Sequence, residues 1–352
     1  MMFKIKKSMI RKILLMQFLL LTGMSLRSQD VHFSQFYSTP LFVNPAMTGI
    51  VDGKFRISNN YRSQWGSAGG YSTFHISGDM PLGRTRFKNN YFGVGLLIYQ
   101  DKAGDAKFTN TVMEGSLAYT TTLDDGDNYI AIGFRGGIDS REMDLSKATW
   151  DNQWNGDVYN PLLSGESLPY HQRSYFDFTA GLMWYYIPDG RNNISVGGSM
   201  SHIAKPDLSF SPAAEDVLNN TIIVHASAEL CMDPYATFWV APKLFAQFEG
   251  VQREIVAGSF VKTRVQIKTK YTNFKKDMYF SFGAWYRLED AFILATRFEF
   301  NDFGLGISYD FTTSELGSLL GSGGGPEFTL SYVMSEKRGQ RTKHFNKMPK
   351  FF

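Results

Sequence analysis

The feature that most constrains this chain is a two-residue alternation of apolar and polar or small side chains, sustained over runs of about ten residues. Residues 176–186 show it: aromatic and aliphatic side chains alternate with Asp177, Thr179 and Gly181. Strands of globular proteins usually span five or six residues. Strands of outer-membrane barrels need about ten, with apolar side chains toward lipid and polar ones toward the lumen. The length of these runs therefore favours a transmembrane β-barrel over a β-sandwich.

The same alternation recurs along the whole chain and predicts about fourteen strands, an even number, as bacterial barrels require. We predict an all-β fold: a transmembrane antiparallel up-and-down β-barrel forming a single domain over residues 54–334. The strands are expected near 54–65, 71–80, 90–100, 108–122, 128–139, 174–187, 192–203, 221–232, 236–248, 252–267, 277–287, 291–301, 303–313 and 326–334.

The lengths of the connections give an independent check on the topology. If the first strand starts in the periplasm, each even-numbered strand should lead into a short periplasmic turn. The connections after strands four, six, eight and twelve are short and rich in Asp, Asn, Gly and Pro, as tight turns are. The long connections 140–173, 204–220 and 314–325 all follow odd-numbered strands and are expected outside the cell. Residues 268–276 are long for a periplasmic turn, which leaves a misassigned strand open.

Residues 1–28 have the pattern of a secretory signal peptide. Lysines and an arginine precede the apolar run 13–21, which is too short to span a bilayer. Cleavage after Ser28 would leave Gln29 as the new N-terminus; the alternative is an uncleaved anchor helix. Export and the alternation together predict an integral protein of the outer membrane. Its net charge of +3 does not indicate nucleic acid, and its single cysteine, Cys231, excludes an internal disulfide.

Residues 29–53 precede the first strand and are unusually apolar for a free periplasmic segment. They include Phe33, Phe36 and Tyr37 together with two prolines that discourage strand pairing. We expect this segment to pack into the lumen or against the periplasmic mouth of the barrel. The alternative is a disordered lead-in.

The connection 140–173 carries an unusual number of aromatic anchors for one loop. Trp150, Trp154, Tyr159 and Tyr170 are residue types that dominate binding hot spots, because they bury much area at low entropic cost. This composition favours a partner-binding loop. The alternative is a loop that folds back and plugs its own lumen.

The C-terminal stretch 335–352 follows the last strand and is basic. Its cations include Lys337, Arg338 and Arg341, and strand parity places it in the periplasm. Such a tail could meet an acidic periplasmic partner or anionic lipid head groups. The alternative is that it is only solvated.

The sequence gives little support for catalysis, a cofactor or a metal. An enzyme needs a nucleophile, a base and an orienting group in mutual reach. His225, Ser227 and Glu229 would share a lumen face, but a polar lumen needs such groups in any case. The turn 124–127 (Asp-Asp-Gly-Asp) could coordinate calcium, although a tight acidic turn accounts for it equally. We expect a non-enzymatic protein with no cofactor and no metal.

Several segments resemble the PorP/SprF family of the type IX secretion and gliding machinery of Bacteroidota. The similarity runs over essentially the whole mature chain, and the basic tail after 335 is longer than the family pattern. The segments that carry it are 29–37 (Gln-Asp-Val-His-Phe-Ser-Gln-Phe-Tyr), 40–46 (Pro-Leu-Phe-Val-Asn-Pro-Ala), Thr48-Gly49, 60–65 (Asn-Tyr-Arg-Ser-Gln-Trp), 101–105 (Asp-Lys-Ala-Gly-Asp), Asp290-Ala291 and 304–310 (Gly-Leu-Gly-Ile-Ser-Tyr-Asp).

The resemblance implies an outer-membrane barrel that serves type IX export. Its implied partners are the C-terminal domain of an exported surface adhesin and the outer-membrane and periplasmic lipoprotein components of the secretion system. Two roles follow: supporting export and surface attachment of that cargo, or linking the outer membrane to the periplasmic lipoprotein ring and motor. A passive diffusion porin is an alternative of a different class, because fourteen strands can enclose a water-filled lumen.

Overall fold

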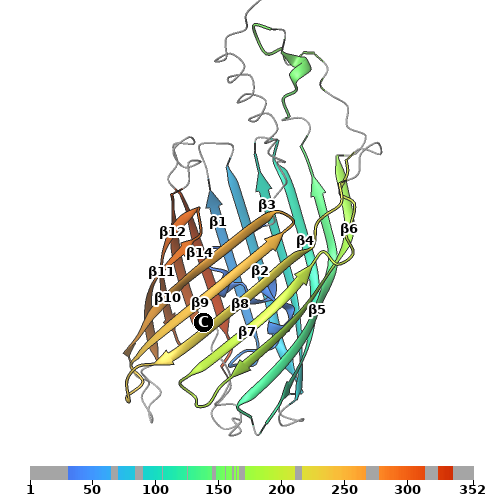
Figure 1. Cartoon of the computed structure of the whole chain (residues 1–352). Coiled ribbons are helices and arrows are strands. Elements are labelled where there is room, and N and C mark those ends of the chain that lie inside the picture. Colours follow the sequence, from blue (N-terminus) through green and yellow to red (C-terminus); the bar gives the residue numbers. More distant parts are fainter. Residues whose placement is uncertain are drawn as a thin grey trace, which may run out of the picture. The chain divides into compact units, whose positions relative to one another are not determined.

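Fourteen antiparallel strands close into a single barrel in the computed structural model, each strand paired with its two neighbours and β1 with β14 (Figure 1). The structure describes residues 31–64, 70–83, 90–104, 106–124, 126–144, 148–154, 156–160, 162–163, 165, 171–210, 216–266, 277–313 and 324–335. Residues 31–352 form one compact unit. The expected signal peptide, 1–28, lies outside the described residues.

The strands lie where the alternation predicts them, and the predicted fold class is confirmed. They are β1 (Arg56–Gln64), β2 (Tyr71–Leu82), β3 (Tyr91–Ala103), β4 (Phe108–Thr122), β5 (Asn128–Glu142), β6 (Gln172–Tyr186), β7 (Asn193–Ser201), β8 (Thr221–Cys231), β9 (Phe238–Glu249), β10 (Gln252–Gln266), β11 (Met278–Arg287), β12 (Ala291–Phe300), β13 (Phe303–Thr312) and β14 (Gly324–Val333). β10 pairs directly with β11, so no barrel strand is missing between them.

The two faces of the wall differ as the alternation predicts. On β5, Ile132, Phe134 and Ile138 point outward and are exposed, whereas Ala131 and Arg135 between them are buried. The same division holds around the barrel, so its exterior is a continuous apolar surface. Such a surface is stable only in lipid.

The two ends of the barrel carry different connections. The end where odd-numbered strands finish, here called the loop mouth, carries the connections 143–171, 202–220 and 313–323. The opposite end, here called the turn mouth, carries mostly short turns together with the longer connection 267–277. In one of them the Asp124 carboxylate accepts hydrogen bonds from the Asn128 side chain and from the backbone N–H groups of Gly126, Asp127 and Asn128. These bonds, the Asn128 side chain first, hold the Asp124 pKa below its usual range. They account for the acidic turn without calcium.

The helical elements are short. Three lie before β1, η1 (Phe36–Ser38), α2 (Pro40–Val43) and η2 (Pro45–Met47), and η3 (Asp151–Gln153) lies in the connection between β5 and β6. No helix in the described part of the chain is both long and apolar enough to cross a membrane.

Replacing Phe134 by Arg tests the assignment of the outer face. Phe134 is 58% exposed at the middle of β5, where an outward side chain meets lipid. We expect Phe134→Arg to lower the free energy of unfolding in phospholipid vesicles by about 2–4 kcal/mol, because a guanidinium is costly at the bilayer midplane. Denaturant titration followed by tryptophan fluorescence measures this. Leu162→Arg, in the connection between β5 and β6, is the control and should leave stability unchanged; equal stability of both variants would contradict the assignment.

Candidate functional site: a plugged lumen between two different mouths

Residues 31–53, here called the plug, occupy the inside of the barrel. The plug hydrogen-bonds or packs against β1, β3, β5, β6, β8, β11, β13 and β14, which together surround the lumen. Its first residues lie near the loop mouth, since Arg62, close to the end of β1, binds the His32 carbonyl. Its last residues lie near the turn mouth, since Arg56 at the start of β1 binds the Met47 and Ile50 carbonyls. The plug therefore extends inside the lumen from the level of Arg62 to the level of Arg56.

Two buried carboxylates hold the part of the plug that lies nearer the loop mouth. Glu327 of β14 accepts the backbone N–H groups of Ser34 at 2.8 Å and Gln35 at 2.9 Å, one on each carboxylate oxygen. Asp310 of β13 accepts the Ser34 hydroxyl at 2.6 Å. The Gln35 amide in turn binds the Glu327 carbonyl and the Thr329 hydroxyl. Charge-assisted bonds to a carboxylate are about twice as strong as neutral ones.

The negative charge of these carboxylates is balanced by arginines of the wall. Arg62 of β1 lies 2.9 Å from Asp310, and Arg287 of β11 lies 3.0 Å from the same carboxylate. Arg287 also contacts Glu254 of β10 at 3.2 Å and donates to the Ser34 hydroxyl at 2.7 Å. Buried charges are tolerated only when they are paired and hydrogen-bonded. The plug supplies part of that pairing, so it belongs to the charge network of the wall.

A second set of polar contacts holds the part of the plug that lies nearer the turn mouth. Arg56 binds Asp79 of β2 in a bidentate pair with both distances at 2.8 Å, and Asp79 also accepts the Gly49 N–H at 2.7 Å. The Asn44 side chain reaches the Leu182 carbonyl of β6 at 3.1 Å and the His225 ring of β8 at 3.0 Å. The plug is thus fixed to walls on opposite sides of the lumen.

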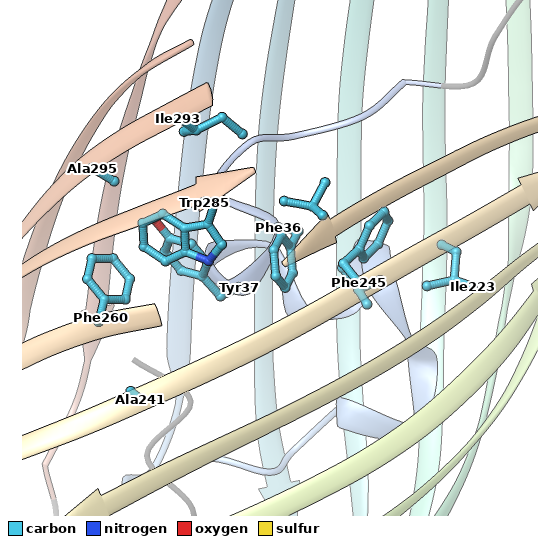
Figure 2. Packing of buried hydrophobic residues seen from close by; sticks show 11 residues of the cluster. Phe36, Tyr37, Ile223, Ala241, Phe245, Phe260, Trp285, Ile293 and Ala295 are labelled. Atoms are coloured by element: carbon cyan, nitrogen blue, oxygen red, sulfur yellow. The ribbon is translucent and has the colours of Figure 1, made fainter. Parts of the chain in front are cut away.

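Apolar packing complements these bonds in three clusters. Phe36, Tyr37 and Val43 pack against β8–β12, and Figure 2 shows Tyr37 stacked on Trp285 and Phe36 beside Phe245. The other two clusters join Leu41 to β3 and β4, and Ala46, Met47 and Ile50 to β5 and β6. Full burial of a large apolar side chain contributes about 1.5–3 kcal/mol.

Inward-facing glycines make room for the plug backbone. A Cβ atom at Gly133 of β5 would lie 2.3 Å from the Pro45 carbonyl carbon, and one at Gly181 of β6 would lie 2.0 Å from the Asn44 Oδ1 atom. Any larger residue at these positions would push the plug away from the wall. These glycines are the sequence signal that marks the path of the plug.

The structure places the expected N-terminal anchors inside the barrel. Phe33, Phe36 and Tyr37 are each buried, and Phe33 makes edge contacts with the rings of Phe42 and His75. They secure the plug and expose no surface to a periplasmic partner while the plug is in place.

A cavity of about 780 Å³ opens at the loop mouth. Its lining mixes polar and apolar surface and carries both signs of charge, including Lys102, Lys107, Glu142 and Asp144. Its lining comes from the outer ends of β1–β5 and from the connections beside them: Ser63, Gly70, Tyr71, Ser72, Lys102, Gly104, Lys107, Thr109, Glu142, Met143, Asp144 and His171. The mouth is therefore hollow above the anchored start of the plug.

The connection 143–171 folds locally around Gln153. The Gln153 side chain binds the Trp150 N–H, the Tyr159 hydroxyl and the Leu163 carbonyl, all within the connection. Trp154 is 56% exposed and Leu162 is 92% exposed, and Tyr159 is also exposed. Trp150 is half-buried, and Tyr170 lies outside the described residues. The described part of the connection thus presents apolar side chains beside the contacts of Gln153.

The turn mouth holds a cluster of cations and aromatic rings. Arg264 of β10 lies 5.5 Å from the Trp239 ring centroid and 5.3 Å from that of Tyr279. Lys262 is paired with Glu299 at 3.1 Å and Glu229 at 3.6 Å. The chain leaves β14 at this same end, because Val333 pairs with Arg56 at the start of β1. Lys337, Arg338 and Arg341 of the tail lie outside the described residues.

The polar groups considered for catalysis go to separate partners. His225 faces the lumen as expected, but its ring contacts Asn44 of the plug. The Ser227 hydroxyl pairs with Ser195 at 2.8 Å, and Glu229 pairs with Lys262. Within the described ranges, no group of three or more His, Cys, Asp or Glu residues is placed to hold a metal ion. The arrangement offers binding and support, with no assembled nucleophile and base among these three residues.

Comparison with known proteins gives a family and a set of similar barrels. The family model for the type IX secretion system membrane protein PorP/SprF matches residues 25–332. No curated protein sequence matches the chain. The toluene transporter TbuX of Ralstonia pickettii is 10% identical with a TM-score of 0.49, covering 84% of this chain and 92% of its own. The CymD monoaromatic hydrocarbon channel is 7% identical with a TM-score of 0.47, covering 85% and 93%.

Replacing Glu327 by Gln tests how the plug is held. An amide has one acceptor oxygen, so one of the two N–H groups of Ser34 and Gln35 would lose its partner. We expect a loss of about 1–3 kcal/mol in the free energy of unfolding, together with transient openings in planar bilayers and faster protease cleavage within 31–53. Wild-type protein should be silent. Glu289→Gln, at an exposed acid, is the control; wild-type conductance and cleavage in Glu327→Gln would contradict this anchor.

Proposed function

Since the chain belongs to the PorP/SprF family of type IX secretion system membrane proteins, we propose that it is a non-enzymatic platform in the outer membrane. It supports export and surface attachment of a large adhesin-type cargo by binding the C-terminal domain of that cargo at the loop mouth. Its location in the outer membrane follows from the barrel and the family. The cargo, its domain and the mode of attachment are the proposal.

The observation that carries this proposal is the filled lumen. The plug is anchored by Glu327 of β14 and Asp79 of β2 on one side of the lumen and through Asn44 to β6 and β8 on the other, and it packs into three apolar clusters. A diffusion porin needs a water-filled path through the barrel. A barrel with an ordered segment along its axis is suited to hold a partner at its mouths. This argues against the passive porin and for binding without turnover.

The loop mouth is the side we assign to cargo. The two longest connections, 143–171 and 202–220, lie there, and connection parity predicts that this mouth faces outside the cell. Trp154, Leu162 and Leu163 expose apolar surface on this connection, and the residues at its two ends, Met143, Asp144 and His171, line the cavity. Exposed aromatic and aliphatic anchors with a polar rim are the usual composition of a binding hot spot.

The turn mouth supports a second role within the same system. Arg264 and the rings of Trp239 and Tyr279 form a cation–aromatic cluster at the end expected to face the periplasm, in which Trp239 is buried and Arg264 and Tyr279 are half-buried. A protein that links the barrel to the periplasmic lipoprotein ring would dock there. The two roles use opposite ends and can be separated by mutation.

Mutation of the exposed anchors tests the cargo role. Trp154→Ala combined with Leu162→Ala should reduce cargo on the cell surface, because loss of hot-spot side chains costs about 2 kcal/mol or more of binding free energy. Surface immunostaining measures the cargo, and immunoblotting of the outer-membrane fraction measures the barrel. Met113→Ala, an exposed apolar residue on the lipid face, is the control. Equal surface cargo in the double variant and the control would refute the cargo-binding connection.

Purification identifies the partner itself. The wild-type barrel, solubilised in detergent and captured by a tag, should bring down an exported protein through its C-terminal domain, as identified by mass spectrometry. Recovery of periplasmic lipoproteins without an exported protein would favour the linking role instead. In that case the lipoproteins should be lost with Arg264→Ala and still be recovered with the Trp154→Ala and Leu162→Ala double variant.

A further inference from the structure

We propose that the outer half of β6, residues 172–177, is a docking edge onto which an extended segment of the exported partner adds as a further β-strand. This inference rests on the proposed cargo role and names the way in which that partner is held. It comes from the register of the barrel, which is incomplete at one place beside the long connection.

The pairing of β6 is unequal on its two sides. On one side β6 pairs with β5 along its whole length, from Gln172 to Tyr186. On the other side it pairs with β7 only over residues 180–186, because β7 ends at Ser201. His202 then has a φ of 57°, which turns the chain out of the strand direction. Figure 1 shows the β5–β6 pair continuing toward the loop mouth past the end of β7.

The backbone groups at this edge can be assigned from one hydrogen bond. The Phe178 carbonyl accepts the Ile203 N–H at 3.2 Å, so the Phe178 backbone faces the side of β7. Because backbone groups alternate along a strand, Phe176 and Ser174 face the same side. Within the described part of the chain, neither has a backbone partner there. A donor and an acceptor at each position are therefore available in strand geometry.

In its described residues, the neighbouring connection contacts the inner end of this edge, where His202 pairs with Asp177 at 2.8 Å. Beyond that point, described residues of the connection make backbone hydrogen bonds with one another. Leu208 donates to the Asp216 carbonyl at 2.9 Å, and Leu218 donates to the Pro206 carbonyl at 3.0 Å. The Asp207 carboxylate accepts the backbone N–H groups of Ser209 and Asp216.

The outward-facing side chains of the edge, those of Gln172, Ser174 and Phe176, do not cover its backbone. The Ser174 hydroxyl and the Gln172 amide both donate to the Ser140 hydroxyl of β5, away from the open side. Phe176 points outward and is 65% exposed. The edge thus combines open backbone groups with one apolar side chain beside them.

These features select an extended peptide as the occupant. An exposed strand edge binds another strand through main-chain hydrogen bonds, while alternate side chains provide specificity. Six residues of edge span about 20 Å, the length of an ordinary strand. The edge also begins directly where the connection 143–171 ends, so a partner held by Trp154 and Leu162 has an edge to pair with in the same mouth.

Proline at Ser174 is the specific test, because it removes the N–H that faces the edge and leaves pairing with β5 intact. Ser174→Ala is the matched control, since it loses the same hydroxyl and keeps the N–H. Each variant also carries p-benzoylphenylalanine at position 172 as a photo-crosslinking probe, and intact cells are irradiated. Heat-modifiable migration on gels verifies that each barrel is folded.

We expect a crosslink to the C-terminal domain of an exported protein in the Ser174→Ala background, mapped by mass spectrometry to a single extended segment. The yield should fall by about ten-fold or more with Ser174→Pro, because the first main-chain bond is lost and the proline ring blocks its neighbour. Equal yields in the two backgrounds would overturn the docking edge. A crosslink to a second copy of this chain, or to residues 202–220, would overturn it as well.

The failure of this inference is distinguishable from failure of the proposed function. If the edge is wrong but the platform is right, surface cargo remains dependent on Trp154 and Leu162 and is equal in Ser174→Pro and Ser174→Ala. If the platform is wrong, none of these variants changes surface cargo, and irradiation yields no adduct with an exported protein.

Discussion

The structure depends on the requirement that every backbone N–H and C=O group inside lipid be paired within the protein. Fourteen strands satisfy it only by closing β1 onto β14, which leaves no edge along the membrane-spanning part of the wall. Closure in turn separates two faces, and the alternation of Phe134 outside with Arg135 inside follows from that separation. The same constraint therefore sets strand length, strand number and the chemical difference between the exterior and the lumen.

The polar lumen creates a second requirement, because its charges are far from bulk water and must be paired. Glu327, Asp310, Arg62 and Arg287 meet this requirement partly among themselves and partly through Ser34 and Gln35 of the plug. Several backbone N–H groups of the plug have no partner within its own helices, since these helices are only three or four residues long. Wall carboxylates and plug N–H groups thus satisfy each other, so removing either would leave the other with buried unpaired groups.

The strands, and the side of the wall toward which each side chain points, could be predicted from sequence because both depend on residues close together in the chain. The outward rows of β3, β5 and β6 follow directly from the alternation. The plug contacts could not be predicted in this way: Ser34 and Glu327 are almost 300 positions apart, and nothing local pairs them. Inward glycines such as Gly133 and Gly181 were a usable signal, since a lumen position without a side chain indicates a close backbone neighbour. Composition predicts that both Trp150 and Trp154 are binding anchors. In the structure Trp150 is half-buried, and Trp154 is the more accessible of the two.

The position of the open edge on β6 is consistent with the closure constraint. An unpaired strand edge is unfavourable in lipid but acceptable where water or a partner reaches it. Along the outward row of β6, the apolar side chains end at Phe176, and Ser174 and Gln172 continue the strand. The pairing with β7 stops within a few residues of this change. The barrel thus stays closed along most of its apolar band, and its wall opens near the outer end of that band, at Phe176. A binding edge at that level can accept a partner strand without breaking the seal of the lumen, which the plug maintains independently.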